Sequence, residues 1–129
     1  MSPDRYLDKA RRALASARLL LEDGDTEGAC NRAYYAMFDA AHAALLAGVP
    51  DFNTGSTKTH RGLIAALGRY LIVPGHLPDT LGRALNQVER VRLLADYTGE
   101  GIDACKARWA IQQAAEFLSQ IEASISIDR

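Results

Sequence analysis

The chain has 129 residues and a mass of 14.0 kDa, with 48% hydrophobic and 24% charged residues, as expected of a single domain that spans residues 1–129. Fifteen Lys and Arg residues stand against sixteen Asp and Glu residues, which gives a formal net charge of −1. This balance argues against a protein that binds nucleic acid or a membrane surface through its overall charge.

Apolar residues recur every three or four positions between turn residues, so the sequence predicts helices along the whole chain. The first helix is expected to begin after Ser2, its cap, and to end near Glu22 at an Asp-Gly-Asp turn. The second begins after the capping residue Asp25 and extends to Gly48. Residues 51–59 have the composition of a loop.

Three further helices are predicted in the second half of the chain. The third extends from about Thr59 and ends before Pro74, and the fourth extends from around residues 78–79 to Thr98. Asp103 is the expected cap of the fifth helix. No segment has the alternation typical of a strand, so the predicted fold is all-α, an up-and-down bundle of about five helices.

The expected location of the protein rests on sequence features that are missing, namely cysteine patterns, membrane spans and a secretory signal. Cys30 and Cys105 are far apart and have no metal-ligand spacing, so neither a disulfide framework nor a zinc module is indicated. No apolar run has the length of a membrane span, and the N-terminus lacks the layout of a secretory signal. We therefore expect a cytoplasmic protein without contact with a membrane.

A polar stripe on the second helix is the first candidate site. Its members, spaced three and four residues apart, are Arg32, Tyr35, Asp39 and His42. The stripe is either a solvated face or the lining of a cleft. Asp39 and His42 have the spacing of a metal-binding pair, but no second pair is present to complete a two-metal site. We therefore expect no metal and no cofactor.

A second candidate lies in the fourth helix, where Glu89, Arg92 and Asp96 are three and four residues apart and Tyr97 follows. This pattern is typical of an ion pair within a helix, and it also suits an anion or phosphate site, because guanidinium donors match phosphate oxygens. Residues 58–92 contain six basic and two acidic residues, a local net charge of +4. The near-neutral total therefore conceals a basic middle segment.

Three segments together resemble a HEPN domain, a name that stands for higher eukaryotes and prokaryotes nucleotide-binding. They are Asn31-Arg-Ala-Tyr-Tyr-Ala-Met-Phe with the residues that follow it, Lys58-Thr-His-Arg-Gly-Leu, and Arg90-Val-Arg-Leu-Leu-Ala-Asp-Tyr. The resemblance covers essentially the whole chain. It implies a helical bundle that forms a homodimer, encoded beside a minimal nucleotidyltransferase, with the pair often acting as toxin and antitoxin.

Active members of the family are metal-independent ribonucleases that use an Arg followed after four to six residues by a His. Arg92 matches the Arg, but Asp96 and Tyr97 stand in the region where the His is expected. His42 or His60 can replace the missing group only if folding or dimerisation brings it to Arg92. In related pairs the partner modifies a nearby Tyr with nucleotide, which makes Tyr97 a candidate acceptor.

The leading hypothesis is a cleft that binds RNA or nucleotide phosphate. Its expected lining residues are Arg92, Asp96 and Tyr97, which would be catalytic if the protein cleaves RNA, together with Arg32, Tyr35 and His60. Two alternatives remain at this point. One is a non-catalytic nucleotide-binding or adaptor dimer, and the other is a structural dimer with solvated polar stripes.

Overall fold

The computed structural model describes residues 1–99 and 101–128, with side chains described outside 95–98 and 127–128. Within these ranges the chain forms five α-helices: α1 (Pro3–Glu22), α2 (Thr26–Gly48), α3 (His60–Leu67), α4 (Asp79–Thr98) and α5 (Ala104–Asp128). A 3-10 turn, η1 (Thr54–Ser56), precedes α3, and a π-helical turn, η2 (Gly68–Ile72), continues it. The described residues contain no strand, which confirms the predicted all-α bundle.

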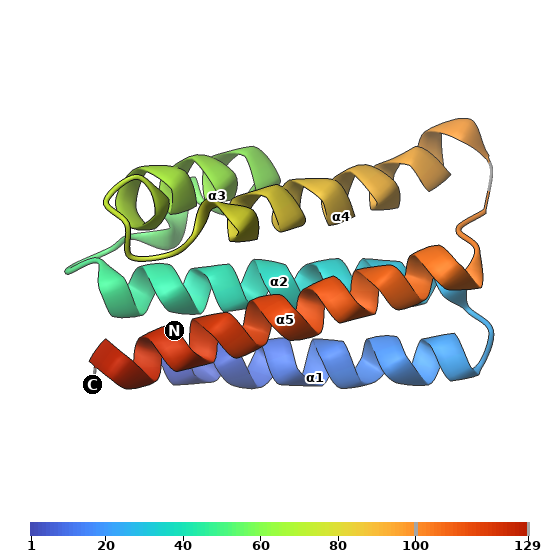
Figure 1. The fold of residues 1–129 in the computed structure, drawn as a ribbon, viewed down its shortest axis with the longest axis horizontal. Coiled ribbons are helices and arrows are strands. Elements are labelled where there is room, and N and C mark those ends of the chain that lie inside the picture. The colour runs from blue at the N-terminus through green and yellow to red at the C-terminus, as the bar shows by residue number, and fades with distance from the viewer. Residues whose placement is uncertain (100, 129) are drawn as a thin grey trace.

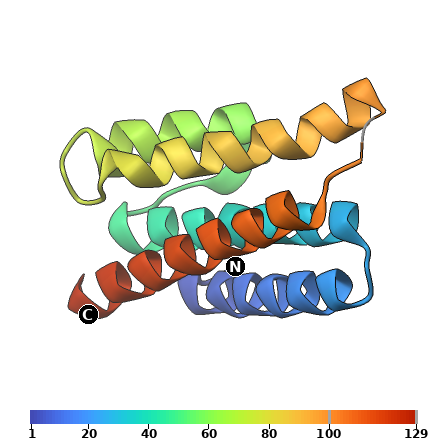
Figure 2. The same cartoon turned by 45° about the vertical axis from the view of Figure 1, so that its right-hand side comes forward.

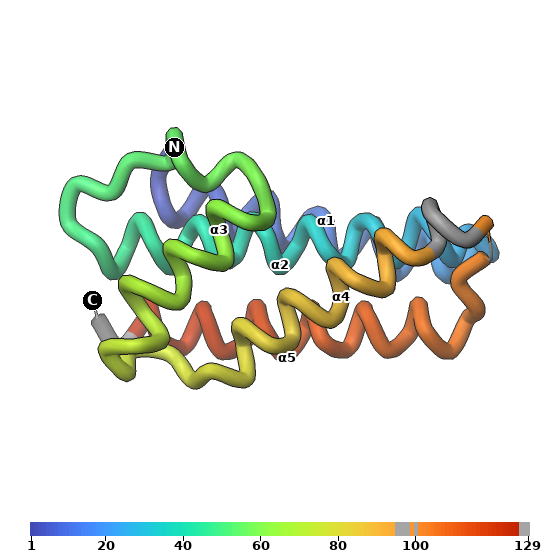
Figure 3. Tube along the Cα trace, turned by 90° about the horizontal axis from the view of Figure 1, so that it is seen from above, coloured from blue at the N-terminus to red at the C-terminus, as the bar shows by residue number. Residues whose placement is uncertain are grey.

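Helix α2 lies at the centre of the bundle. It packs against α1, α5, α4, α3 and η2. In Figure 1, α1 forms the lower layer, α2 and α5 the middle layer, and α3 and α4 the upper layer. The turned view in Figure 2 keeps this order, and Figure 3 shows from above that α4 crosses over the α2–α5 layer. Within the described residues, no helix has the combined length and apolar character needed to cross a membrane.

Side-chain caps explain where four of the helices begin. In each of these, an oxygen of the preceding residue accepts a hydrogen bond from a backbone N–H of the first turn. The capping residues are Ser2 for α1, Asp25 for α2, Thr59 for α3 and Asp103 for α5. Helix α4 follows Pro78 without such a bond and ends at Gly99, whose φ of 71° favours glycine. These boundaries match those predicted from the sequence.

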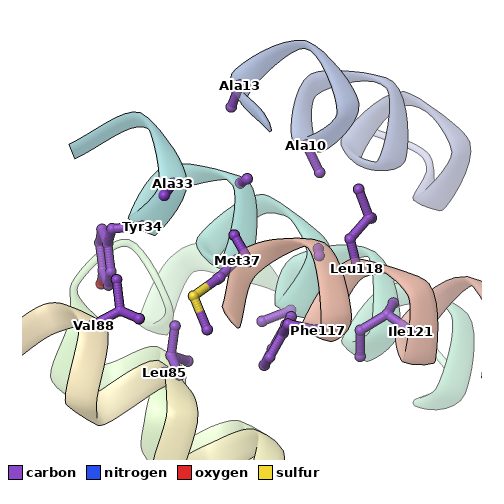
Figure 4. Packing of buried hydrophobic residues seen from close by; sticks show 14 of the residues in the cluster. Ala10, Ala13, Ala33, Tyr34, Met37, Leu85, Val88, Phe117, Leu118 and Ile121 are labelled. Carbon is purple, nitrogen blue, oxygen red and sulfur yellow. The ribbon is translucent and has the colours of Figure 1, made fainter. Parts of the chain in front are cut away.

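The core between α1, α2 and α5 consists largely of alanine. Each of these helices contributes buried alanines, among them Ala10, Ala13 and Ala17 of α1, Ala33, Ala36 and Ala40 of α2, and Ala107, Ala110 and Ala114 of α5. Because alanine projects only a methyl group, the helix backbones can approach closely. Larger side chains such as Met37, Leu85 and Phe117 fill the space between α2, α4 and α5 (Figure 4).

The segment before α3 is fixed to α2 by His42. The ring Nε2 of His42 lies 3.0 Å from both the carbonyl oxygen and the hydroxyl of Thr57, and Nδ1 lies 2.9 Å from the Phe38 carbonyl oxygen. The same ring stacks on Tyr6 of α1, with a centroid distance of 5.1 Å. Only 3% of His42 is exposed. His42 therefore serves the fold, by holding η1 and the start of α3 against the central helix.

A close backbone contact reinforces this attachment. A Cβ atom placed on Gly62 in α3 would overlap with the carbonyl oxygen of Ser56 in η1. Only glycine permits this approach without a shift of the loop or the helix. In contrast, a Cβ on Gly68 would meet no atom within 4 Å.

We therefore expect Gly62→Ala to lower the free energy of unfolding by about 1–3 kcal/mol, because the overlap must be relieved by movement of packed backbone. Gly68→Ala, the matched control, should leave it unchanged or raise it by about 0.5 kcal/mol through the smaller entropy of the unfolded chain. Urea denaturation followed by circular dichroism measures both values. Equal effects of the two substitutions would show that the Ser56–Gly62 contact does not constrain the loop.

Candidate functional site

Arg92 of α4 lies at the centre of a polar cluster between α4 and α2. Its Nε and one terminal nitrogen donate to the same carboxylate oxygen of Glu89, at 2.9 and 2.7 Å. The other terminal nitrogen donates to Asn31 Oδ1 at 3.3 Å. The guanidinium carbon lies 4.5 Å from the ring centroid of Tyr34 and 5.7 Å from that of Tyr35. The cation is thus held by an ion pair at its edge and by aromatic rings at its face.

Burial and charge set the protonation states of this cluster. Burial lowers the pKa of the Arg92 guanidinium, but the hydrogen bonds and the negative charge of Glu89 outweigh this effect and raise it above its ordinary value. Burial also raises the pKa of the Tyr34 hydroxyl, Glu89 raises it further, and Arg92 opposes both. Arg92 is therefore a permanent cation, and Tyr34 keeps its hydroxyl proton at neutral pH.

His60 is connected to Arg92 through Tyr34. The Tyr34 hydroxyl lies 2.8 Å from His60 Nδ1, and His60 Nε2 lies 2.9 Å from Asn86 Oδ1. Asn86 Oδ1 can only accept, so His60 Nε2–H donates to it, and the tautomer with the ring proton on Nε2 lets Nδ1 accept from the Tyr34 hydroxyl, with the amide oriented as in the structure. This chain of bonds joins α2, α3 and α4. It leaves His60 one side chain away from the Arg92 cation.

A pocket of about 280 Å³ opens beside this cluster, between α3 and α4. Its lining residues are His60, Asn86, Glu89, Arg90, Leu93 and Leu94. Glu89 is shared between the pocket and the Arg92 ion pair. Arg90 and His60 therefore line a small hollow whose walls include two leucines, and the charge of its acidic wall residue, Glu89, is balanced by Arg92. This arrangement can accommodate an anionic ligand that also has an apolar part.

The structure brings together four of the site residues predicted from the sequence. Arg92 stacks over Tyr35, the Arg32 guanidinium carbon lies 6.0 Å from the Tyr35 ring centroid, and His60 joins Arg92 through Tyr34. Asp96 and Tyr97 belong to α4, but their side chains lie outside the described residues. Of the two histidines considered as replacements for the family's motif His, His60 is the one that approaches Arg92.

The prediction that four polar residues of α2 form one continuous surface is wrong. Arg32 and Tyr35 are exposed, whereas Asp39 and His42 are buried. Asp39 lies 4.0 Å from Lys9 of α1, and its pKa is raised by burial, against the opposing charges of Lys9, His42 and Arg32. The stripe divides because α2 is covered by α1 along part of that face. Among the described side chains, no group of three or more His, Cys, Asp or Glu residues is arranged to hold a metal ion.

Sequence reasoning missed Tyr34, Asn31 and Asn86 as members of the site. Tyr34 falls on the buried face of α2, where its periodicity resembles that of any core residue, and Figure 4 places it beside Val88 of α4. The one available signal was its hydroxyl, since a buried tyrosine normally needs a hydrogen-bond partner. Asn86 pairs with His60 across two helices, and no local pattern predicts that contact.

Comparison with known proteins supports the architecture and its classification. The sequence profile of the HEPN domain matches residues 4–124. The chain is 36% identical to a UPF0332 protein of Gloeobacter violaceus over 92% of this chain and 93% of that protein. It is 34% identical to a UPF0332 protein of Thermotoga maritima over 88% of this chain and 83% of the relative.

A third relative, from Methanocaldococcus jannaschii, is named "Putative toxin MJ0605" and is 29% identical over 92% of this chain and 85% of the relative. The profile match extends through all five described helices, from the first turn of α1 into the last turns of α5. The chain belongs to the HEPN family.

Proposed function

We propose that this chain is a toxin-type HEPN protein that binds the phosphate of RNA or of a nucleotide at Arg92. The observation that carries the proposal is the state of the Arg92 guanidinium, which is charged, about 20% exposed and fixed in orientation by Glu89 and two tyrosine rings. A cation held in this way loses little side-chain entropy when an anion binds.

The guanidinium retains donors for such a ligand. Among the described side chains, Glu89 and Asn31 occupy three of its five N–H groups. The remaining two can reach phosphate oxygens, while Arg32 and Arg90 add positive charge nearby. Glu89 neutralises Arg92 in the free protein, so a phosphate ligand also has to compete with this carboxylate.

The proposed biological setting comes from the relatives and from the resemblance. One relative is named as a toxin, which supports a toxin-type role for this chain. A minimal nucleotidyltransferase is the partner that the family resemblance implies. Pairing into a homodimer is likewise what the family resemblance implies. Sedimentation equilibrium tests this pairing, and a monomer at tens of micromolar protein would refute it.

Cleavage of RNA requires a group that moves a proton, and His60 is the histidine best situated for this task. Both of its ring nitrogens are already engaged, with Tyr34 and Asn86. Cleavage at this site therefore needs one of these bonds to open on substrate binding. The second candidate function, a non-catalytic nucleotide-binding or adaptor protein, is favoured by this same saturation of His60.

We expect Arg92→Gln to weaken the binding of a fluorescein-labelled oligoribonucleotide by about tenfold or more, because it removes a charge-assisted hydrogen bond to phosphate. The slope of log affinity against log salt should become shallower by about 0.7 for each phosphate of the single strand that the variant no longer neutralises. Fluorescence anisotropy at several salt concentrations measures both quantities.

Two further variants make this experiment specific. Arg18→Gln removes an equal charge from the exposed surface of α1, and it should change the affinity by less than about twofold. Arg92→Lys keeps a charge beside Glu89 but lacks the planar set of guanidinium donors. This variant should therefore fold like the wild-type protein and bind the oligoribonucleotide more weakly than the wild-type protein does. Affinity unchanged in both Arg92 variants would contradict a phosphate site at this position.

Incubation of total RNA with the protein in the presence of EDTA separates the two candidate functions. For a ribonuclease, we expect cleavage products with the wild-type protein and about a hundredfold slower cleavage with His60→Asn, because general acid–base groups contribute rates of this order. The Arg92→Lys variant serves as a second inactive form. Intact RNA with wild-type protein that still binds the oligoribonucleotide would favour the adaptor.

A further inference from the structure

We propose that the groove between α3 and α4 receives one unpaired base of an RNA strand whose phosphate lies at Arg92. This inference rests on the proposed function and specifies its ligand. The groove is the pocket of about 280 Å³ described above, and it adjoins Arg92 through their shared neighbour Glu89. A phosphate at Arg92 would therefore carry its nucleoside toward this groove.

The lining of the groove suits a planar, partly apolar ligand. Leu93 and Leu94 supply an apolar wall, and His60, Asn86 and Arg90 supply polar edges. Binding sites for small organic groups typically combine apolar walls with a few placed polar groups in this way. The groove is small and shallow, so it can admit a single base that is splayed out from a strand, but not a base pair held in a duplex.

Asn86 offers a defined hydrogen-bonding edge. Its amide oxygen is engaged, because it accepts from His60 Nε2–H at 2.9 Å. The amide NH₂ group is left to donate, and donors of this kind recognise the acceptor atoms on the edge of a base. The His60 ring is fixed at both nitrogens, so the oxygen of Asn86 is held in place and its NH₂ group has a set direction.

Positive charge lies at the edge of the groove. Arg90 of α4 lines it, is exposed and forms no ion pair among the described residues. By contrast, Arg83 is paired with Asp79 at 2.8 Å, one turn into α4. An unpaired arginine at the edge of the groove is complementary to a phosphate next to a bound base. This second cation favours a single strand of RNA, which has neighbouring phosphates, over a lone nucleotide.

The test compares two isosteric substitutions on α4. Asn86→Asp keeps the oxygen that accepts from His60 but replaces the donating NH₂ with an acceptor, whereas Gln87→Glu adds the same charge at the next, exposed position outside the groove. The probes are a labelled mixed-sequence 12-mer oligoribonucleotide and the same strand annealed to its complement. The readout is fluorescence anisotropy, and thermal melts verify that each variant is folded.

We expect the wild-type protein to bind the single strand about tenfold more tightly than the duplex, since only the single strand can place a base in the groove. Asn86→Asp should lower the affinity for the single strand by about tenfold and should change the affinity for the duplex no more than Gln87→Glu does. Arg90→Gln should also weaken single-strand binding, and Arg83→Gln, its control on the same helix, should not.

Two results would contradict the binding of a base in the groove. They are equal effects of Asn86→Asp and Gln87→Glu on the single strand, and equal affinity of the wild-type protein for single strand and duplex. Either result leaves the proposed phosphate site intact if Arg92→Lys still weakens binding. Conversely, unchanged binding by both Arg92→Gln and Arg92→Lys, together with a weakening specific to Asn86→Asp, would refute the phosphate site while the base-binding groove remained.

Discussion

The burial of the second half of α2 is the constraint on which the rest of this structure depends. From Ala36 to Leu45 every residue of this helix except the partly buried Phe38 is buried, so each side chain there must suit a neighbouring helix or segment. Alanines serve the close contacts with α1 and α5. Of its buried polar side chains, Asp39 lies next to Lys9 of α1, whereas Tyr34 and His42 form hydrogen bonds with the start of α3 and the segment before it in the upper layer.

Two of these residues, His42 and Tyr34, act as hydrogen-bonding clamps on the same segment of chain. His42 holds Thr57 just before α3, and Tyr34 holds His60 in the first turn of α3. In the described part of the chain, no buried side-chain nitrogen or oxygen lacks a partner. Such saturation matters energetically, because an unpaired buried polar group costs about 1–3 kcal/mol. The upper layer is thereby attached to α2 by specific bonds as well as by apolar contact.

The candidate site is a consequence of the same attachment. Tyr34 has two roles, since its ring lies under the Arg92 cation while its hydroxyl orients His60. A phosphate-binding cation and a histidine are therefore positioned by one rigid side chain of the central helix. Glu89 balances the charge of Arg92 in the free protein, so a half-buried arginine is tolerated without an unpaired charge in the fold.

The sequence was sufficient to predict the all-α bundle and most helix boundaries, because apolar periodicity and capping residues are local signals that a short window of chain contains. It also identified Arg92, Arg32, Tyr35 and His60 as candidates from residue chemistry and from the resemblance to a HEPN domain. It could not show that Asp39 and His42 are buried, since the covering of one part of α2 by α1 is a tertiary effect.

Which histidine approaches Arg92 depends on how the helices pack. His60 is 32 positions before Arg92 in the sequence, and Asn86 and Tyr34 each lie 26 positions from His60. Contacts between groups so far apart depend on how three helices pack, and packing is set by the summed shape of many side chains rather than by any local pattern. The groove beside Arg92 exists for the same reason, because its walls come from α3 and α4 together.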